Sequence, residues 1–174
     1  MSDLPSGWMP NAPMKRVIIH WTAGSYTASA LDKEHYHFLI QGNGCVVRGS
    51  VPVNANVPPL REGCYAAHTL NANSYSIGVS LCCMANATES PFNAGSYPMK
   101  EVQFKSAINV VAALCKRYNI PVTDKTVLTH AEVQPNLGIK QRGKWDITHL
   151  AFDPSTVGAQ AVGDKIRRLV KEQL

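Results

Sequence analysis

The sequence predicts an α/β fold: a single domain with a central mixed β-sheet flanked by helices. Two observations favour this class. Short apolar runs of strand length alternate irregularly with helix-like stretches, a pattern typical of sheets covered by helices. In addition, no repeat, low-complexity stretch or break in composition divides the 174 residues, a length that suits one domain. We therefore expect residues 1–174 to form one domain.

The expected strands are short and apolar. The clearest hairpin signal is the turn sequence Gly42-Asn43-Gly44 between two apolar runs, because glycine and asparagine tolerate the positive φ of tight turns. The last expected strand ends directly before His130. We expect strands over residues 15–20, 36–40, 45–48, 76–81 and 126–129.

The longest expected helix runs from about residue 99 to 118, because its apolar positions recur at helical spacing and share one face. A short helix over 27–34 would be capped by Thr27. Pro154 and Ser155 would open a C-terminal helix over 155–174, and the proline-containing residues 1–13 are expected to form an extended arm. The shared face of the long helix consists of Phe104, Ile108, Val111, Cys115 and Tyr118.

The net charge of the chain indicates which kinds of partner it could bind. The net charge is +5 and the isoelectric point is near 9.0, which favours an acidic partner such as nucleic acid, a membrane surface or the bacterial wall. Basic residues are not interleaved with aromatic ones, so we expect no nucleic-acid partner. No apolar run approaches the roughly 20 residues of a membrane span, so we expect none.

The number and spacing of the cysteines indicate that the protein folds in a reducing compartment. Their number, five, is odd, two of them are adjacent, and no CxxC pair occurs, which does not suit a disulfide framework. The first residues show neither a basic n-region nor an apolar h-region, so we expect no signal peptide.

Two histidines are placed alike. His20 and His130 each end a short apolar strand where a loop begins, and strand ends are where sites gather in α/β sheets. Either one alone would more often be structural. Together with Asp146 they make a candidate three-ligand zinc site, since catalytic zinc commonly takes three protein ligands. His149 is a competing third ligand, because it lies three residues after Asp146.

Other polar residues could serve the same site. Lys144, two residues before Asp146, could stabilise an oxyanion, although a solvated lysine is the simpler interpretation. In an expected strand from His35 to Phe38, alternation sends Tyr36 to one face and both His35 and His37 to the other. His68 follows small residues and suits a loop lining a cleft.

Five motifs in sequence order resemble the zinc N-acetylmuramoyl-L-alanine amidases. This family includes phage lysozyme-type amidases, bacterial wall-recycling amidases and peptidoglycan recognition proteins. The similarity runs from about residue 15 to 150, and a segment of the helix over 97–118 adds to it. The motifs are Val-Ile-Ile-His20-Trp-Thr-Ala-Gly, Tyr36-His-Phe-Leu-Ile, His68, Asn73-Ser-Tyr-Ser-Ile-Gly-Val79, and Leu-Thr-His130-Ala-Glu.

The resemblance implies roles for individual residues. It implies that His20, His130 and Asp146 bind Zn²⁺, that Lys144 stabilises the oxyanion, and that Tyr36 lies near the metal with a catalytic role. His37 also matches a histidine of the family, and alternation marks it as structural. The chain departs from many relatives, which have Pro-Gly directly after the third ligand, and its stretch from His130 to Asp146 is long, 146 − 130 = 16 positions. The implied substrate-binding residues are His68, Trp21, Thr22 and Asn73.

The implied activity is zinc-dependent hydrolysis of the amide bond between N-acetylmuramic acid and L-alanine in peptidoglycan. We expect a monomeric phage endolysin, made in the cytoplasm without a signal peptide and released to the wall through a membrane lesion made by a separate protein. Three alternatives stay open: a cytoplasmic recycling amidase acting on soluble anhydro-muropeptides, a secreted effector, and a non-catalytic peptidoglycan-binding module.

Overall fold

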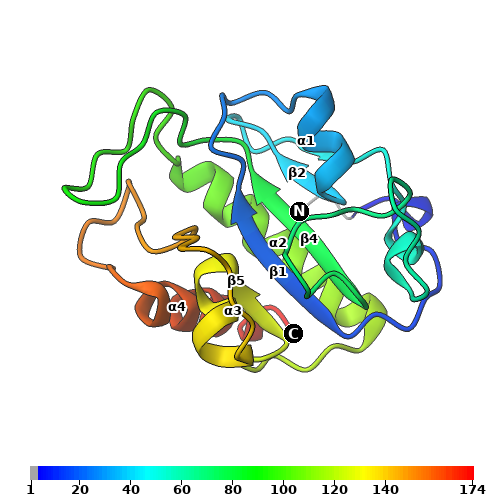
Figure 1. Ribbon diagram of the computed structural model, residues 1–174. Coiled ribbons are helices and arrows are strands. Elements are labelled where there is room, and N and C mark those ends of the chain that lie inside the picture. Colours follow the sequence, from blue (N-terminus) through cyan, green and yellow to red (C-terminus); the bar gives the residue numbers. More distant parts are fainter. Residues whose placement is uncertain (1–3) are drawn as a thin grey trace.

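The computed structural model describes residues 4–174 and contains one five-stranded sheet (Figure 1). Its strand order is β3-β2-β4-β1-β5. The pairs β1–β4, β1–β5 and β2–β4 are parallel, and β2–β3 is antiparallel. The expected mixed sheet is therefore confirmed. The strands are β1 (Arg16–Trp21), β2 (Phe38–Ile40), β3 (Val46–Arg48), β4 (Ser76–Leu81) and β5 (Val127–Thr129).

Helices flank both faces of the sheet, as expected. The long helix α2 (Glu101–Tyr118) packs against β4 and α4 (Ala159–Lys171), while α3 (His130–Leu137) contacts β1 and β5. In Figure 1, α2 lies behind the sheet and α3 in front of it. The short helix α1 (Ala30–His35) follows β1. No helix in residues 4–174 is long and apolar enough to cross a membrane.

The two faces of β1 have different neighbours, because successive side chains of a strand alternate. Val17, Ile19 and Trp21 join the large core beneath α2. Ile18 joins a much smaller cluster on the opposite face, under α3. His20 is two residues further along and therefore points to this second, thinly covered face.

Strand β4 makes room on that same face. Its large residues alternate with small ones, and the small ones pair in register with the even-numbered residues of β1, so Gly78 lies beside Ile18 and Ser80 beside His20. A Cβ atom on Gly78 would lie 2.7 Å from ring atoms of His68. The small residues of β4 therefore leave space for imidazole rings over the sheet.

Several expected boundaries are wrong. α1 begins at Ala30, and its N-cap is Ser29 rather than Thr27, because Ser29 Oγ accepts from the backbone N–H of Asp32 and the Asp32 carboxylate accepts from that of Ser29. The C-terminal helix begins at Ala159 instead of 155. Residues 153–156 form a turn in which Asp153 accepts hydrogen bonds from the Ser155 and Thr156 hydroxyls.

Two further elements differ from expectation. The hairpin strand begins at Phe38 instead of residue 36, because His35 ends α1. No helix or strand is expected directly after residue 129, but the structure contains the helix α3 there. Of the expected arm 1–13, residues 1–3 lie outside the described residues, and Ser6–Trp8 form a 3-10 turn. A second 3-10 turn, Val53–Asn56, lies in the loop before β4. All five cysteines are free.

Candidate metal centre

Three buried side chains converge where β1 and β5 end. His20 Nδ1 lies 3.0 Å from His130 Nδ1. Asp146 places Oδ2 3.3 Å from His20 Nδ1 and Oδ1 3.4 Å from His130 Nδ1. The three residues are 0%, 6% and 7% exposed, and they form a group that could hold a metal ion. The structure thus brings together the three residues that the sequence singles out as metal ligands.

The donor set fits zinc. Ligand bonds of 2.0–2.2 Å in a tetrahedral site place neighbouring ligand atoms about 3.3–3.6 Å apart. Two of the three observed separations, 3.3 and 3.4 Å, lie within this range, and the third, 3.0 Å between the two histidine nitrogens, lies just below it. Two imidazoles and one carboxylate are also a common protein ligand set for catalytic zinc, leaving a position for water or substrate.

Local structure explains why these side chains meet. β1 and β5 are parallel neighbours, so their carboxyl ends bring His20 and His130 to one edge of the sheet. The backbone N–H of Ala131 donates to the carbonyl oxygen of Asp146, which fixes Asp146 beside the start of α3. Trp145 packs edge-on against Trp21 with ring centroids 4.8 Å apart and anchors the loop from the other side.

Burial and the contacts within the metal group determine the protonation states of His20 and Asp146. Burial lowers the pKa of His20 to about 4, against the opposing influence of the neighbouring Asp146 carboxylate. Burial alone would raise the pKa of Asp146, but its contacts with His130 and His20 outweigh that effect and lower the pKa. At neutral pH the site therefore offers an uncharged His20 imidazole and an ionised carboxylate, the forms that bind a metal cation.

His149, the competing third ligand in the sequence, lies elsewhere. Its ring stacks on Phe92 with centroids 4.1 Å apart and an interplanar angle of 5°, and its Nδ1 contacts the hydroxyl of Thr148. The group that could hold a metal ion contains Asp146 and not His149. The geometry therefore favours Asp146.

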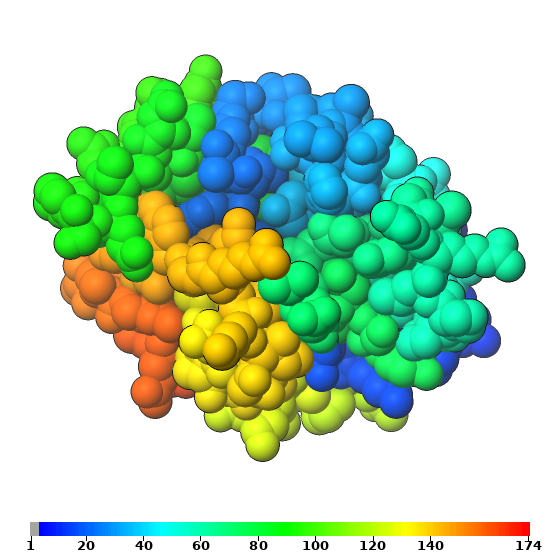
Figure 2. All heavy atoms as spheres, in the orientation of Figure 1, coloured from blue at the N-terminus to red at the C-terminus, as the bar shows by residue number. Residues whose placement is uncertain are grey.

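The convergence point opens into a cleft of about 850 Å³. Figure 2 shows this side of the molecule, where the orange residues near 140–146 project between the blue segment near 20–25 and the blue-green segment near 65–73. All the other residues that the sequence analysis selected for catalysis or substrate binding line this cleft: Lys144, Tyr36, Trp21, Thr22, His68 and Asn73.

Tyr36 lies against the metal group, with its ring centroid 5.1 Å from that of His20. Burial raises the pKa of Tyr36 far above its ordinary value, so its hydroxyl stays a hydrogen-bond donor. The expectation that His35 points away from Tyr36 is wrong, because His35 belongs to α1 and lines the same cleft. His37 is buried between the Asn56 side chain and the backbone N–H of Gly78.

His68 lies directly behind His20. Its Nδ1 is 3.2 Å from His20 Nε2, and its Nε2 is 3.3 Å from the carbonyl oxygen of Ser76. Asn73 orders this loop, since its side-chain oxygen accepts from the backbone N–H groups of His68 and Thr69. Both residues border the cleft, yet both ring nitrogens of His68 and the side-chain oxygen of Asn73 are engaged with the protein itself.

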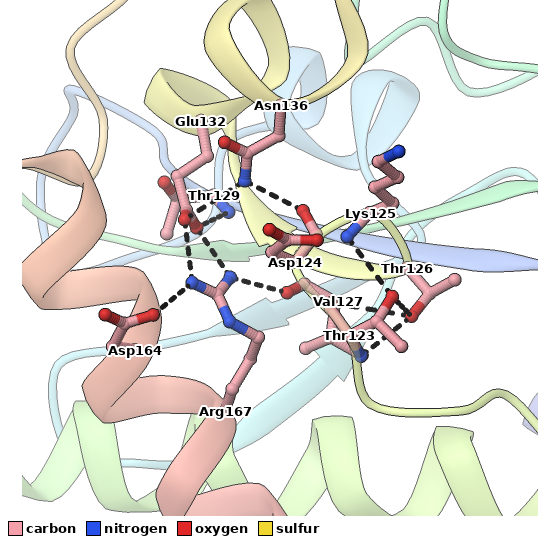
Figure 3. A network of polar contacts seen from close by, with 10 residues as sticks. All are labelled: Thr123, Asp124, Lys125, Thr126, Val127, Thr129, Glu132, Asn136, Asp164 and Arg167. Carbon is pink, nitrogen blue, oxygen red and sulfur yellow. Dashed lines mark hydrogen bonds and ion pairs between the residues drawn. The ribbon is translucent and has the colours of Figure 1, made fainter.

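Sequence reasoning missed two polar residues of the surroundings. Gln141 is 3% exposed and contacts His130, although it follows no motif. Glu132 is buried in a network at the other side of α3, where it pairs with Arg167 of α4 (Figure 3). A signal for Glu132 and for α3 itself was present, because Thr129-His-Ala-Glu132 has the spacing of a helix capping box.

The sequence pattern of the N-acetylmuramoyl-L-alanine amidase family matches residues 10–147. The match covers most of the chain, and the chain belongs to this family. It also includes all three residues of the candidate metal group. No curated protein matches the chain.

Solved structures with a similar fold have low sequence identity. The N-acetylmuramyl-L-alanine amidase AmiD from E. coli, solved with anhydro-N-acetylmuramic acid-L-Ala-D-gamma-Glu-L-Lys, is 19% identical (TM-score 0.48); the match covers 71% of this chain and only half, 50%, of that one. An endolysin from a Thermus scotoductus bacteriophage is 17% identical, over 71% and 75% of the two chains (TM-score 0.47). The peptidoglycan recognition protein PGRP-SA from bumblebee is 20% identical, over 68% and 70% (TM-score 0.47).

Proposed function

We propose that this protein is a zinc-dependent N-acetylmuramoyl-L-alanine amidase, which hydrolyses the amide bond between the lactyl group of N-acetylmuramic acid and L-alanine in peptidoglycan. The observation that carries the proposal is the convergence of His20, His130 and Asp146 at the base of an open cleft in a chain of the amidase family. A non-catalytic binding module needs no such ligand set.

In this proposal His20 Nδ1, His130 Nδ1 and the Asp146 carboxylate hold Zn²⁺. Zinc at such a site supplies Lewis-acid chemistry, which polarises a carbonyl and makes water acidic enough to act as a nucleophile near neutral pH. The chain contributes a rigid, buried set of ligands, so little reorganisation accompanies metal binding.

Lys144 and Tyr36 would stabilise the negative charge that develops on the scissile carbonyl oxygen. Lys144 is exposed on the cleft rim two residues before Asp146, and its ammonium group can reach over the ligands. The Tyr36 hydroxyl remains protonated because of its raised pKa and can donate a hydrogen bond at neutral pH. One such donor contributes about 3 kcal/mol to the transition state.

The cleft would hold the muramoyl group and the stem peptide. Trp21 and Thr22 border it at the end of β1, and His68 and Asn73 border it on the opposite loop. Stem peptides carry carboxylates, and both Arg142 and Lys144 lie on the cleft rim. Their charge would attract an acidic substrate.

The setting we propose is that of a monomeric phage endolysin that reaches the wall through a membrane lesion made by another protein. Five free cysteines suit folding in a reducing compartment, and the net charge of +5 suits an anionic wall. Recycling of soluble anhydro-muropeptides is the competing setting, and the substrate preference distinguishes the two.

The test is a digest of purified sacculi, with and without a chelator, followed by mass analysis of the fragments. We expect free stem peptides with new L-alanine amino termini, lost on chelation and restored by zinc. Cleavage of soluble anhydro-muropeptides alone would overturn the endolysin setting and keep the amidase. Intact substrates of both kinds in a zinc-loaded sample would overturn the amidase.

A further inference from the structure

We propose that Gln141 is a positioning residue for the candidate metal ligand His130: it fixes the tautomer of His130 and so directs the Nδ1 lone pair at the metal. This inference rests on the metal site of the proposed function. Gln141 Oε1 lies 2.7 Å from His130 Nε2, the ring nitrogen that points away from His20 and Asp146. The Gln141 side chain is buried, at 3% exposed.

The orientation of the Gln141 amide follows from its second contact. Its Nε2 lies 2.7 Å from the carbonyl oxygen of Leu70. A carbonyl oxygen can only accept, so the amide nitrogen must face Leu70 and the amide oxygen must face His130. The backbone N–H of Gln141 donates to Gln134 Oε1 at 3.1 Å, which holds the residue in place from a third side.

This orientation decides the tautomer of His130. An amide oxygen can only accept, so His130 Nε2 must carry the proton of the contact. In the neutral imidazole the other nitrogen, Nδ1, then has a free lone pair. That nitrogen is the one 3.0 Å from His20 Nδ1 and 3.4 Å from the Asp146 carboxylate. Gln141 therefore prepares His130 to bind a metal before any metal arrives.

The same loop supports the other histidine in a parallel way. His68 Nε2 faces the Ser76 carbonyl oxygen and donates to it, so His68 Nδ1 accepts, with the Thr69 hydroxyl at 2.7 Å and His20 Nε2 at 3.2 Å as its two neighbours. When His20 Nε2 carries its proton toward this pair, His20 Nδ1 keeps a lone pair toward the site. Leu70, which orients Gln141, lies two residues after His68, so one short loop sets both imidazoles.

The long stretch between His130 and Asp146 contains the side chain that contacts His130 Nε2. Gln141 lies within it, eleven residues after His130 and five before Asp146 (141 − 130 = 11; 146 − 141 = 5). Without the added length, the chain would pass from α3 to Asp146 with less backbone from which a side chain could reach back to His130 Nε2.

The experiment compares Gln141→Leu with Gln141→Glu. The leucine has a similar size but no acceptor, whereas the glutamate keeps an acceptor for His130 Nε2–H. Gln134→Leu is the matched control, because Gln134 accepts from the Gln141 backbone N–H and makes no hydrogen bond with His130. Zinc dissociation constants are measured by competition with a chelating dye, and the tautomer of His130 in the metal-free proteins by long-range ¹H–¹⁵N spectra, with His130→Ala to assign the signal.

We expect His130 to be the Nε2–H tautomer in the wild type and in Gln141→Glu, and a mixture of tautomers in Gln141→Leu. Loss of such an outer partner weakens metal binding about 10- to 100-fold, so Gln141→Leu should show this loss, while Gln141→Glu and Gln134→Leu should stay within about threefold of wild type. Equal zinc affinity in wild type and Gln141→Leu, or an Nδ1–H tautomer in wild type, would overturn the proposal. A fixed Nε2–H tautomer in a wild-type protein that binds no zinc would instead overturn the proposed function.

Discussion

The first turn of α3 contains two buried polar side chains with opposite surroundings. Glu132 has partners for both oxygens: Arg167 donates to each at 3.0 and 2.9 Å, the Thr129 backbone N–H donates to Oε1, and Asn136 donates to Oε2 (Figure 3). His130, two residues earlier, directs Nδ1 at a second imidazole and a carboxylate. Every oxygen of the Glu132 carboxylate therefore accepts hydrogen bonds from donors. The Nδ1 atom of His130, in contrast, faces a nitrogen and an oxygen that are themselves able to bind a metal ion.

The difference separates a structural network from a functional one. A buried charge is tolerated when its partner and hydrogen bonds are all present, as for Glu132. Acceptor atoms that face one another without a donor are destabilising unless a cation lies between them. The Glu132–Arg167 pair joins α3 to α4 and to the Val127 carbonyl of β5, and so holds the helix from which His130 points into the site.

The largest expected effect is that of His130→Ala. Removing one of three ligands should abolish zinc retention and amidase activity together, measured by metal analysis of the purified protein and by the sacculus digest. The unfolding free energy of the metal-free protein should change by only about 1–2 kcal/mol, because the hydrogen bond to Gln141 is the one that the His130 side chain makes outside the candidate metal group. Zinc bound at wild-type stoichiometry would contradict the ligand assignment.

Substitution of Glu132, in the same turn of α3, should change the stability of the protein and not its activity. Glu132→Gln leaves the buried Arg167 with the largely exposed Asp164, 2.9 Å away, as its remaining counter-charge, and should lower the unfolding free energy by about 3–5 kcal/mol, measured by denaturant titration. The exposed ion pair Glu101–Lys105 on α2 is the matched control. Glu101→Ala should change the unfolding free energy by less than about 1 kcal/mol.

Activity per folded Glu132→Gln molecule should stay within a few-fold of wild type. If the variant is too unstable to purify, Glu132→Leu combined with Arg167→Met removes both charges and should recover part of the stability. Unchanged stability in Glu132→Gln would show that the network is not what holds α3.

Lys144→Ala should lower kcat by about 10²–10³-fold while zinc stays bound, because it removes a charge needed only in the transition state. Lys140→Ala is the control: Lys140 is exposed on the same connection but does not border the cleft, so its kcat should be unchanged. Full activity in Lys144→Ala would exclude the oxyanion role.

Acid should destabilise the metal-free protein between about pH 6.5 and 4. Burial lowers the pKa of His37 and of His20 from 6.5 to about 4. The unfolded chain therefore binds more protons than the native one within this window, and stability is complete above it and falls as the pH drops through it. Each histidine should remove on the order of 3 kcal/mol. Urea titrations at pH 7, 5.5 and 4.5 measure the effect, and a constant unfolding free energy would contradict the buried, neutral state.

Much of this fold and of the candidate site can be predicted from local sequence patterns. Short apolar runs predicted the strands beside His20 and His130, since strand length and hydrophobicity are local properties. The spacing of Phe104, Ile108, Val111 and Cys115 predicted the buried face of α2. The order of the motifs selected His20, His130 and Asp146 without any knowledge of their distances.

The side chains that support those residues can be identified only from the packed fold. No pattern in the chain connects Gln141 to His130, or His68 to His20, because these contacts join loops far apart in sequence. The position of His149 outside the metal group, which the sequence could rank only as less favourable than Asp146, likewise depends on where the loop turns after Trp145, which packs against Trp21. Ligand identity follows from local strand ends, whereas the orientation of each ligand depends on side chains that only the packed fold brings together.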